Sequence, residues 1–167
     1  MISTPVNVST TPPIRPATAA DREAIERLLV EAKLPTAGVA ELLATRPADF
    51  FVASDPATEE LVAVAGLECC TENALLRSVA VRPAWRAHGV GRELVKRVLS
   101  EAEARGIRAM YLLTMTAERY FPRFGFERVE RETVPADVAD TVEFRSACPA
   151  SAVVMARPLA KAEAGLP

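Results

Sequence analysis

Two glycines that stand one residue apart, directly before a long amphipathic run, constrain this chain most. They lie in the segment WRAHGVGRELVKRVLSEAEARG, residues 85–106. Beyond Gly91, apolar residues recur at helical spacing and charged residues fill the opposite face, which predicts a helix packed on a sheet, with Gly106 as its C-cap. A helix N-terminus presents unpaired N–H groups with partial positive charge, and glycine lets an anion reach them. The segment therefore predicts an anion-binding loop.

Segments with strand and helix patterns alternate on both sides of this loop. We expect strands near Ile14 and over 50–54, 61–67, 74–81, 110–113, 126–129 and 152–156. Further helices are expected after a capping box at residues 18–21, over 39–44 and over 117–124. This alternation predicts an α/β (α+β) fold with a single domain over residues 14–159. Its twisted mixed sheet would have about six or seven strands, with helices on both faces. Residues 1–13 and 160–167 are expected to be flexible tails.

Composition excludes several classes of protein. The chain has 167 residues, of which 50% are hydrophobic and 25% charged, as expected for a globular domain. The formal net charge is -2 and the charges are interspersed, which argues against a nucleic-acid partner. No apolar run approaches the roughly 20 residues of a membrane span, and no secretory signal is evident, so we expect no membrane partner and a cytoplasmic location. Three cysteines and one histidine predict neither a disulfide framework nor a metal site.

Spacing narrows the choice of anionic ligand. The loop lacks the Gly-Lys-Ser/Thr of a Walker motif and the third glycine of the dinucleotide fingerprint. What remains is Arg-x-x-Gly-x-Gly at residues 86–91, preceded by SVAVRP at 78–83. This pattern resembles the acetyl-CoA motif of the GNAT acyltransferase superfamily. The segment AERYFPRFGF, residues 117–126, is similar to the short helix ending in Gly-Phe of the same superfamily.

The resemblance implies that acetyl-CoA is the co-substrate. The loop would hold its pyrophosphate, His88 contributing backbone rather than imidazole, and the preceding strand would bond the pantetheine arm through its backbone. Thr114 would contact cofactor or substrate, although it would equally serve as a strand-to-helix cap. The residues expected to bind acetyl-CoA are Val79, Ala80, Val81, Arg86, Ala87, His88, Gly89, Val90, Gly91, Arg92, Thr114 and Phe121.

Three further stretches narrow the resemblance within the superfamily. LLRSVAV, YLLTMTAERYFPRFGF and EFRSACPASAVVM look like the ArsN-type N-acetyltransferases found with arsenic-resistance genes, and more distantly like N-acetylglutamate synthases. This resemblance implies acetylation of the α-amino group of a free amino acid, or detoxification of a glutamate-like analogue such as arsinothricin or phosphinothricin. It leaves open whether the last strand completes the sheet within one chain or across a homodimer.

The chemistry of acetyl transfer points to candidate catalytic residues. The acceptor amine must lose a proton, and Glu68 at the end of an apolar strand is a candidate base; an ordinary exposed carboxylate is the alternative. The superfamily often places a tyrosine four residues before the glycine of Gly-Phe, where this chain has Phe121. In the superfamily that tyrosine protonates the leaving CoA thiolate. Tyr120 is next to Phe121 but points about 100° away on a helix, so it does not simply inherit this role. It is a candidate acid, with an amphipathic anchor as the alternative.

Arginines should line a pocket for an amino acid. Arg77 interrupts an apolar strand and is the first candidate for substrate binding, with Ser78 and Thr116 as further candidates. The resemblance to N-acetylglutamate synthases adds Arg145, which would otherwise be a solvated loop residue. Two other functions remain open: acetylation of a protein or peptide, and a silent acetyl-CoA-binding module, which Phe121 favours. Cys69 and Cys70 are adjacent and should face opposite sides of a strand, so buried packing is preferred over a joint arsenic site.

Overall fold

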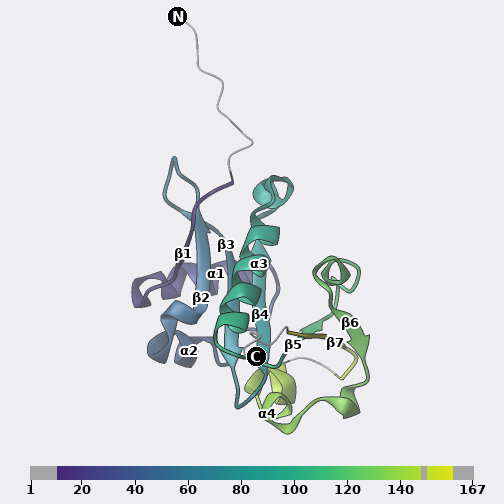
Figure 1. Cartoon of the computed structure of the whole chain (residues 1–167). Helices are drawn as coiled ribbons and strands as arrows, with labels where there is room; N and C mark the ends of the chain where they lie inside the picture. The colour runs from purple at the N-terminus through teal and green to yellow at the C-terminus, as the bar shows by residue number, and fades with distance from the viewer. Residues whose placement is uncertain (1–10, 148–149, 160–167) are drawn as a thin grey trace, which may run out of the picture.

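A seven-stranded mixed sheet forms the centre of the molecule (Figure 1). The computed structural model describes residues 11–147 and 150–159. The strand order is β1-β2-β3-β4-β5-β7-β6, and every neighbouring pair is antiparallel except β4 and β5, which run parallel. The α/β fold with one mixed sheet is therefore confirmed, and β7 completes the sheet within this chain. The strands are β1 (Ile14–Pro16), β2 (Phe50–Ser54), β3 (Leu61–Cys69), β4 (Ala74–Val81), β5 (Ala109–Thr114), β6 (Glu127–Val129) and β7 (Val153–Pro158).

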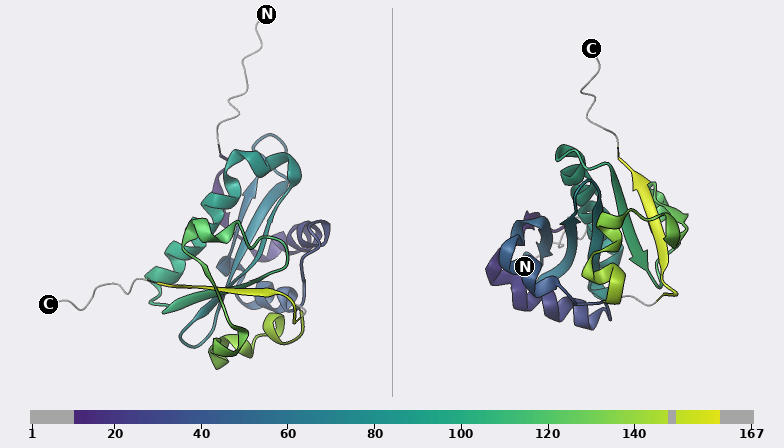
Figure 2. Two further views of the ribbon diagram at one scale, coloured as in Figure 1. Left: turned by 90° about the vertical axis from the view of Figure 1, so that its right-hand side faces the viewer. Right: turned by 90° about the horizontal axis from the view of Figure 1, so that it is seen from below.

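Helices cover both faces of the sheet, as the alternating pattern predicted. The long helix α3 (Val90–Ala104) lies across one face, in front of the sheet in Figure 1. The other face carries α1 (Arg22–Glu31) and α2 (Val39–Thr45) over β2–β4, while the short α4 (Ala136–Ala139) packs beside β4 and β7. Two further views show these layers edge on (Figure 2).

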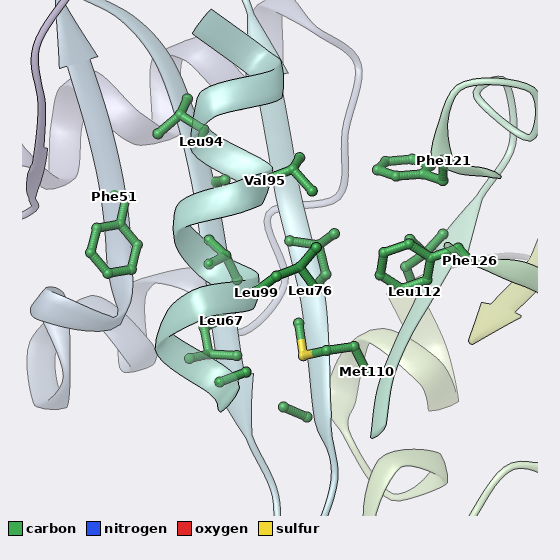
Figure 3. Packing of buried hydrophobic residues seen from close by; sticks show 14 of the residues in the cluster. Phe51, Leu67, Leu76, Leu94, Val95, Leu99, Met110, Leu112, Phe121 and Phe126 are labelled. Atoms are coloured by element: carbon green, nitrogen blue, oxygen red, sulfur yellow. The ribbon is translucent and has the colours of Figure 1, made fainter. Parts of the chain in front are cut away.

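The larger core lies under α3, because its apolar face is buried against inward-facing strand residues. Leu94, Val95 and Leu99 of this helix pack with side chains from β2 to β5, among them Leu76 and Met110 (Figure 3). Complete burial of each such side chain contributes about 1.5–3 kcal/mol to folding. This packing holds the N-terminus of α3, and with it the glycine loop, in place beside β4.

The two parts of the sheet separate where β4 passes β5. The parallel register joins these strands only at Ala74↔Met110 and Leu75↔Tyr111. Further along, β4 carries a bulge opposite β3, and Ser78 adopts a left-handed backbone with φ of 58°. A bulge bends a strand and increases its twist, so β4 turns away from β5 beyond Leu75. Figure 3 shows the two strands diverging above Met110.

Two local expectations were wrong. The helix predicted over 117–124 is only a 3₁₀ turn, Phe121–Phe124, because Pro122 has no N–H to donate to an earlier helical turn. The sequence pattern also did not predict α4 or the π-helical turn Glu143–Ala147 that follows it. Both lie between β6 and β7 and bring residues of the C-terminal part back to β4.

The tails expected from composition fall mostly outside the described residues. Of residues 1–13 the structure describes 11–13, where the Thr11 hydroxyl donates a hydrogen bond to the His88 carbonyl at 3.3 Å. The expected tail 160–167 lies outside the described residues altogether. Within the part that is described, no helix combines the length and the apolar character needed to cross a bilayer.

Candidate functional site

A cavity of about 1040 Å³ opens where β4 and β5 diverge. Its walls are residues 32–35 after α1, residues 76–81 of β4, the glycine loop, and residues 112–117 at the end of β5. Pockets for small ligands have volumes of about 300–1000 Å³, so this cavity is at the upper end of the range and can hold an extended ligand. One end of the cavity lies at the glycine loop, and the other is a charged, buried end around Arg77.

The glycine loop forms the end that sequence analysis assigned to phosphate. Gly89 is the N-cap of α3 and has φ of 76°, a conformation that glycine adopts without strain. A Cβ on Gly91 would lie 3.1 Å from Val81 Cγ2 and 3.4 Å from the Tyr120 hydroxyl, so this site has no room to spare for a side chain. Arg86, Arg92 and Arg123 also line this cavity. The residues present therefore fit a pyrophosphate held by helix N–H groups and guanidinium groups.

In the middle of the cavity, β4 pairs with β3 along one edge, and its other edge borders the cavity. Beyond Leu75, no described residue of β5 pairs with β4. Val79, Ala80 and Val81 line the cavity here, as expected for residues that contact acetyl-CoA through their backbone. Unpaired strand N–H and C=O groups can pair with the amides of an extended ligand, as in strand addition to a sheet edge. The pantetheine arm of coenzyme A carries two such amides.

A buried cluster of one arginine and two glutamates forms the other end. Arg77 donates to Glu68 Oε1 at 2.8 Å and lies 3.4 Å from Glu143 Oε1. Its remaining donors reach the Ala37 carbonyl at 2.8 Å and the Ser78 hydroxyl at 3.3 Å. Only 1% of the Arg77 side chain is exposed, so all its contacts are with protein groups. Arg77 therefore lines the cavity, but its guanidinium is already paired with two carboxylates, and its role in substrate binding stays a prediction.

Glu143 is the residue of this cluster that sequence reasoning missed. It belongs to the π-helical turn, lines the cavity, and leaves 6% of its side chain exposed. Burial raises the pKa of its carboxyl group, the Arg77 charge lowers it, and the Glu68 charge raises it again, with a net rise. A signal was present, because a glutamate stands between Val142 and Phe144 in TVEF. A carboxylate in an apolar stretch is costly unless it is paired or faces a cleft.

The aromatic pair before Gly-Phe occupies two different places. Phe121 is buried in the cavity wall. Tyr120 lines the cavity too, but its hydroxyl lies at Gly91 and the Arg123 guanidinium stacks on its ring at 4.4 Å. Burial raises the pKa of Tyr120, and the charges of Arg123 and Arg92 oppose that rise. The hydroxyl thus lies at the phosphate loop, where it fits an anchoring role better than protonation of a thiolate.

The remaining predicted residues divide into those at the cavity and those away from it. Ser78, Thr114 and Thr116 line the cavity, and the Thr114 hydroxyl accepts a hydrogen bond from the Ala117 N–H at 2.9 Å, the capping geometry that was the alternative for this residue. The Arg145 side chain is exposed. The predicted residues that do not line the cavity are Glu68, Ala87, His88, Val90 and Arg145; their roles stay predictions.

The adjacent cysteines pack apart, as the alternation of a strand requires. Cys69 packs against the core under α3, and Cys70 against the cluster around Leu75 and Val138. Burial raises the pKa of both thiols, that of Cys70 to about 12, so their thiolates are suppressed at neutral pH. Among the described residues, no group of three His, Cys, Asp or Glu side chains has the arrangement of a metal site.

Comparison with known proteins shows which family the sequence of this chain resembles. Residues 46–128, from the end of α2 into β6, match the model for an acetyltransferase (GNAT) domain. An amino-acid acetyltransferase of Mycobacterium tuberculosis is 38% identical over 65 residues, which is 39% of this chain and 37% of that protein. One of Aeromonas salmonicida is 32% identical over 79 residues, or 46% of this chain and 18% of that protein. The matched segment thus spans well under two thirds of these curated relatives.

Solved structures extend the similarity to most of the chain. Rv2747 from Mycobacterium tuberculosis, in complex with CoA and NLQ, aligns with a TM-score of 0.75 and 26% identity over 89% of this chain and 100% of that one. N-acetylglutamate synthase from Neisseria gonorrhoeae, complexed with coenzyme A and N-acetyl-glutamate, aligns with a TM-score of 0.75 and 19% identity over 89% of this chain and 35% of that one. By fold and by sequence match, the chain belongs to the GNAT superfamily of N-acetyltransferases and is related to the amino-acid acetyltransferases.

Proposed function

We propose that this protein transfers an acetyl group from acetyl-CoA to the α-amino group of a free amino acid or an amino-acid analogue. One observation carries the proposal: a single cavity connects the glycine loop, through the gap between β4 and β5, to the buried charges around Arg77. A ligand with phosphates at one end and a reactive thioester at the other would span this length. The acceptor would then meet the thioester at the charged end.

Three parts of the cavity would bind different parts of acetyl-CoA. The N-terminus of α3 with Arg86 and Arg92 holds the pyrophosphate, and the edge of β4 that β5 leaves open beyond Leu75 aligns the pantetheine arm. Strand N–H groups between Ser78 and Val81 would donate to the carbonyl oxygen, which becomes negative when the amine attacks. Positioning the amine beside the carbonyl carbon supplies much of the rate, because a bimolecular step becomes intramolecular.

The acceptor is proposed to be small and acidic. The relatives matched by sequence are amino-acid acetyltransferases, and one structural neighbour was solved with N-acetyl-glutamate. At the acceptor end Arg77 is bonded to two carboxylates, whereas Lys33 lines the cavity from an exposed loop and forms no ion pair among the described residues. Lys33 is therefore available to bind an acceptor carboxylate. Glutamate, and its analogues phosphinothricin and arsinothricin, are the acceptors to test first.

The test is a thiol-release assay with acetyl-CoA and a panel of acceptors. The panel contains glutamate, aspartate, phosphinothricin, arsinothricin and a basic peptide. We expect turnover of at least one acidic amino acid or analogue, with little turnover of the peptide, and a lower kcat/KM for Arg77→Ala. Preference for the peptide would favour protein acetylation instead. Acetyl-CoA binding without turnover of any acceptor would favour a silent binding module.

A further inference from the structure

Glu143 is a carboxylate that the fold delivers to the acceptor end of the cavity from a distant part of the chain. It is the only acidic residue among the described residues that line this cavity. Thr141 fixes the turn that carries Glu143: the Thr141 hydroxyl accepts from the Phe144 N–H at 3.2 Å, and the Thr141 carbonyl accepts from the Arg145 N–H at 3.0 Å. Phe144 packs with Leu75 of β4 and Val138 of α4. The carboxylate is thus held by backbone structure and core packing.

The charges around Glu143 suit a cationic group. Arg77 faces it from β4, Glu68 reaches the same guanidinium from β3, and Lys33 lines the cavity from the loop after α1. One guanidinium between two carboxylates leaves the buried cluster with an excess of negative charge. An amino-acid acceptor arrives with a protonated amine, which such a cluster attracts. The carboxylate that is bonded least closely to Arg77, at 3.4 Å, is the one that lines the cavity.

We propose that Glu143 binds the acceptor ammonium group and removes its proton, with Arg77 as the residue that positions the carboxylate. This assignment rests on the proposed function, since it requires an amine acceptor. It differs from the sequence-based choice of Glu68, which lies at 2.8 Å from Arg77 and does not line the cavity. Burial raises the pKa of the Glu143 carboxyl group above its ordinary value, which makes the carboxylate a better proton acceptor.

The proton and electron balance is complete without a further reactant. The acceptor ammonium gives one proton to the Glu143 carboxylate, and the freed nitrogen lone pair forms the N–C bond to the thioester carbonyl carbon. The C–S bond then breaks and its electron pair leaves with sulfur. The nitrogen loses its second proton to that thiolate, which yields CoA–SH and the acetamide. Glu143 returns its proton to water through the cavity.

The experiment compares three glutamate-to-glutamine variants with the wild type, using the best acceptor from the panel. Glu143→Gln keeps the size of the side chain and removes the base, Glu68→Gln removes the other partner of Arg77, and Glu132→Gln alters an exposed glutamate outside the cavity. Thermal unfolding and acetyl-CoA affinity are measured for each variant. The kinetic readout is kcat/KM for the acceptor as a function of pH.

We expect Glu143→Gln to lower kcat/KM about 100-fold or more, the usual contribution of a general base, with acetyl-CoA affinity unchanged. In the wild type, activity should fall at acidic pH as Glu143 is protonated. That acidic limb should disappear in Glu143→Gln, whose activity then rises only where solution base deprotonates the acceptor. Glu68→Gln should retain the limb with a smaller loss of rate, and Glu132→Gln should match the wild type.

Several results would overturn the assignment. They are a kcat/KM of Glu143→Gln within about threefold of the wild type, an unchanged acidic limb, or identical losses in Glu143→Gln and Glu68→Gln. If Glu143→Gln does not fold, Glu143→Asp decides: a slower enzyme with the limb preserved supports the base, and a lost limb contradicts it. A wild type that acetylates no amine refutes the proposed function itself, whereas a normal wild type with an unaffected variant refutes only the role of Glu143.

Discussion

At the scale of single residues, a substitution at Gly91 is expected to weaken ligand binding without destabilising the fold. Its backbone is not in the left-handed region, and an added Cβ would lie 3.1 Å from Val81 Cγ2, so a small shift of that side chain makes room for alanine. We expect Gly91→Ala to keep its melting temperature, because alanine favours a helix. The methyl group would stand between the phosphates and the helix N–H groups. Calorimetry should show about a tenfold weaker Kd for acetyl-CoA, or ~1.4 kcal/mol.

Gly106 provides the opposite case and serves as the control. It has φ of 76°, the same value as Gly89, and a Cβ there would meet no atom within 4 Å. Alanine at Gly106 should therefore destabilise the fold by about 1–2 kcal/mol through backbone strain alone. Because Gly106 lies at the far end of α3 from the cavity, acetyl-CoA affinity should not change. Tight acetyl-CoA binding by Gly91→Ala, or weak binding by Gly106→Ala, would contradict the placement of the phosphates.

Gly66 is a third position, where close packing leaves no room for a side chain. A Cβ on Gly66 would lie 2.6 Å from Cε2 of the fully buried Phe50 ring, and neither group can move far in the middle of the sheet. We expect Gly66→Ala to lower the free energy of unfolding by about 1–3 kcal/mol, as overpacked cores do. Urea unfolding followed by circular dichroism measures this loss. An unchanged midpoint would mean that β2 and β3 adapt more easily than their packing indicates.

At the scale of elements, Asp137 fastens α4 to the turn between β3 and β4. Its carboxylate accepts from the N–H groups of Glu72 at 2.9 Å and Asn73 at 3.0 Å, and from the Asn73 side chain at 3.2 Å. Burial acts to raise the pKa of Asp137, but these hydrogen bonds outweigh it and the net pKa is lowered. The carboxylate therefore contributes stability above the pKa of an unfolded aspartate, and that stability is lost as pH falls through the lower folded pKa.

Asp137→Asn should remove this contribution. We expect a loss of about 1–2 kcal/mol near neutral pH, since hydrogen bonds to a charged acceptor are replaced by weaker ones. The difference between variant and wild type should shrink below about pH 4, where an unfolded aspartate is protonated. Unfolding at several pH values measures both effects. A difference that stays constant with pH would show that the ionised carboxylate is not what holds α4.

The elements also show what a sequence can predict of this fold and site. β2 and β4 occupy the residues expected, because their nearly continuous apolar runs are bounded by local turn signals, and α3 follows from its helical period. The turn at Glu143 was missed, since a short π-helical turn has no period of its own. Its position depends on Arg77, 66 residues earlier in the chain, and no local pattern encodes such a contact.

At the scale of the whole molecule, the sheet consists of two parts, β1–β4 and β5–β7. They are joined by a short seam, the parallel pairing of β4 with β5. β1–β4 pair continuously with one another, as do β5–β7, but β4 and β5 share only two register pairs. A ligand that fills the gap would bond to one part and pack against the other. Binding of coenzyme A should therefore stabilise the entire fold, because a ligand that binds only the native state shifts the unfolding equilibrium.

The expected size of this effect can be calculated. At a ligand concentration of about 100 times Kd, the native state gains roughly 2.7 kcal/mol. For a chain of this size each kcal/mol raises the melting temperature by about 2–4 °C, so coenzyme A should raise it by roughly 5–11 °C.

Hydrogen exchange should slow in the second half of β4 and also in β5. Adenosine 3′,5′-bisphosphate, which has no pantetheine arm, should give a smaller rise and leave β5 unprotected. Equal protection by both ligands would mean that binding at the glycine loop alone stabilises the seam, and that the arm does not lie between the strands.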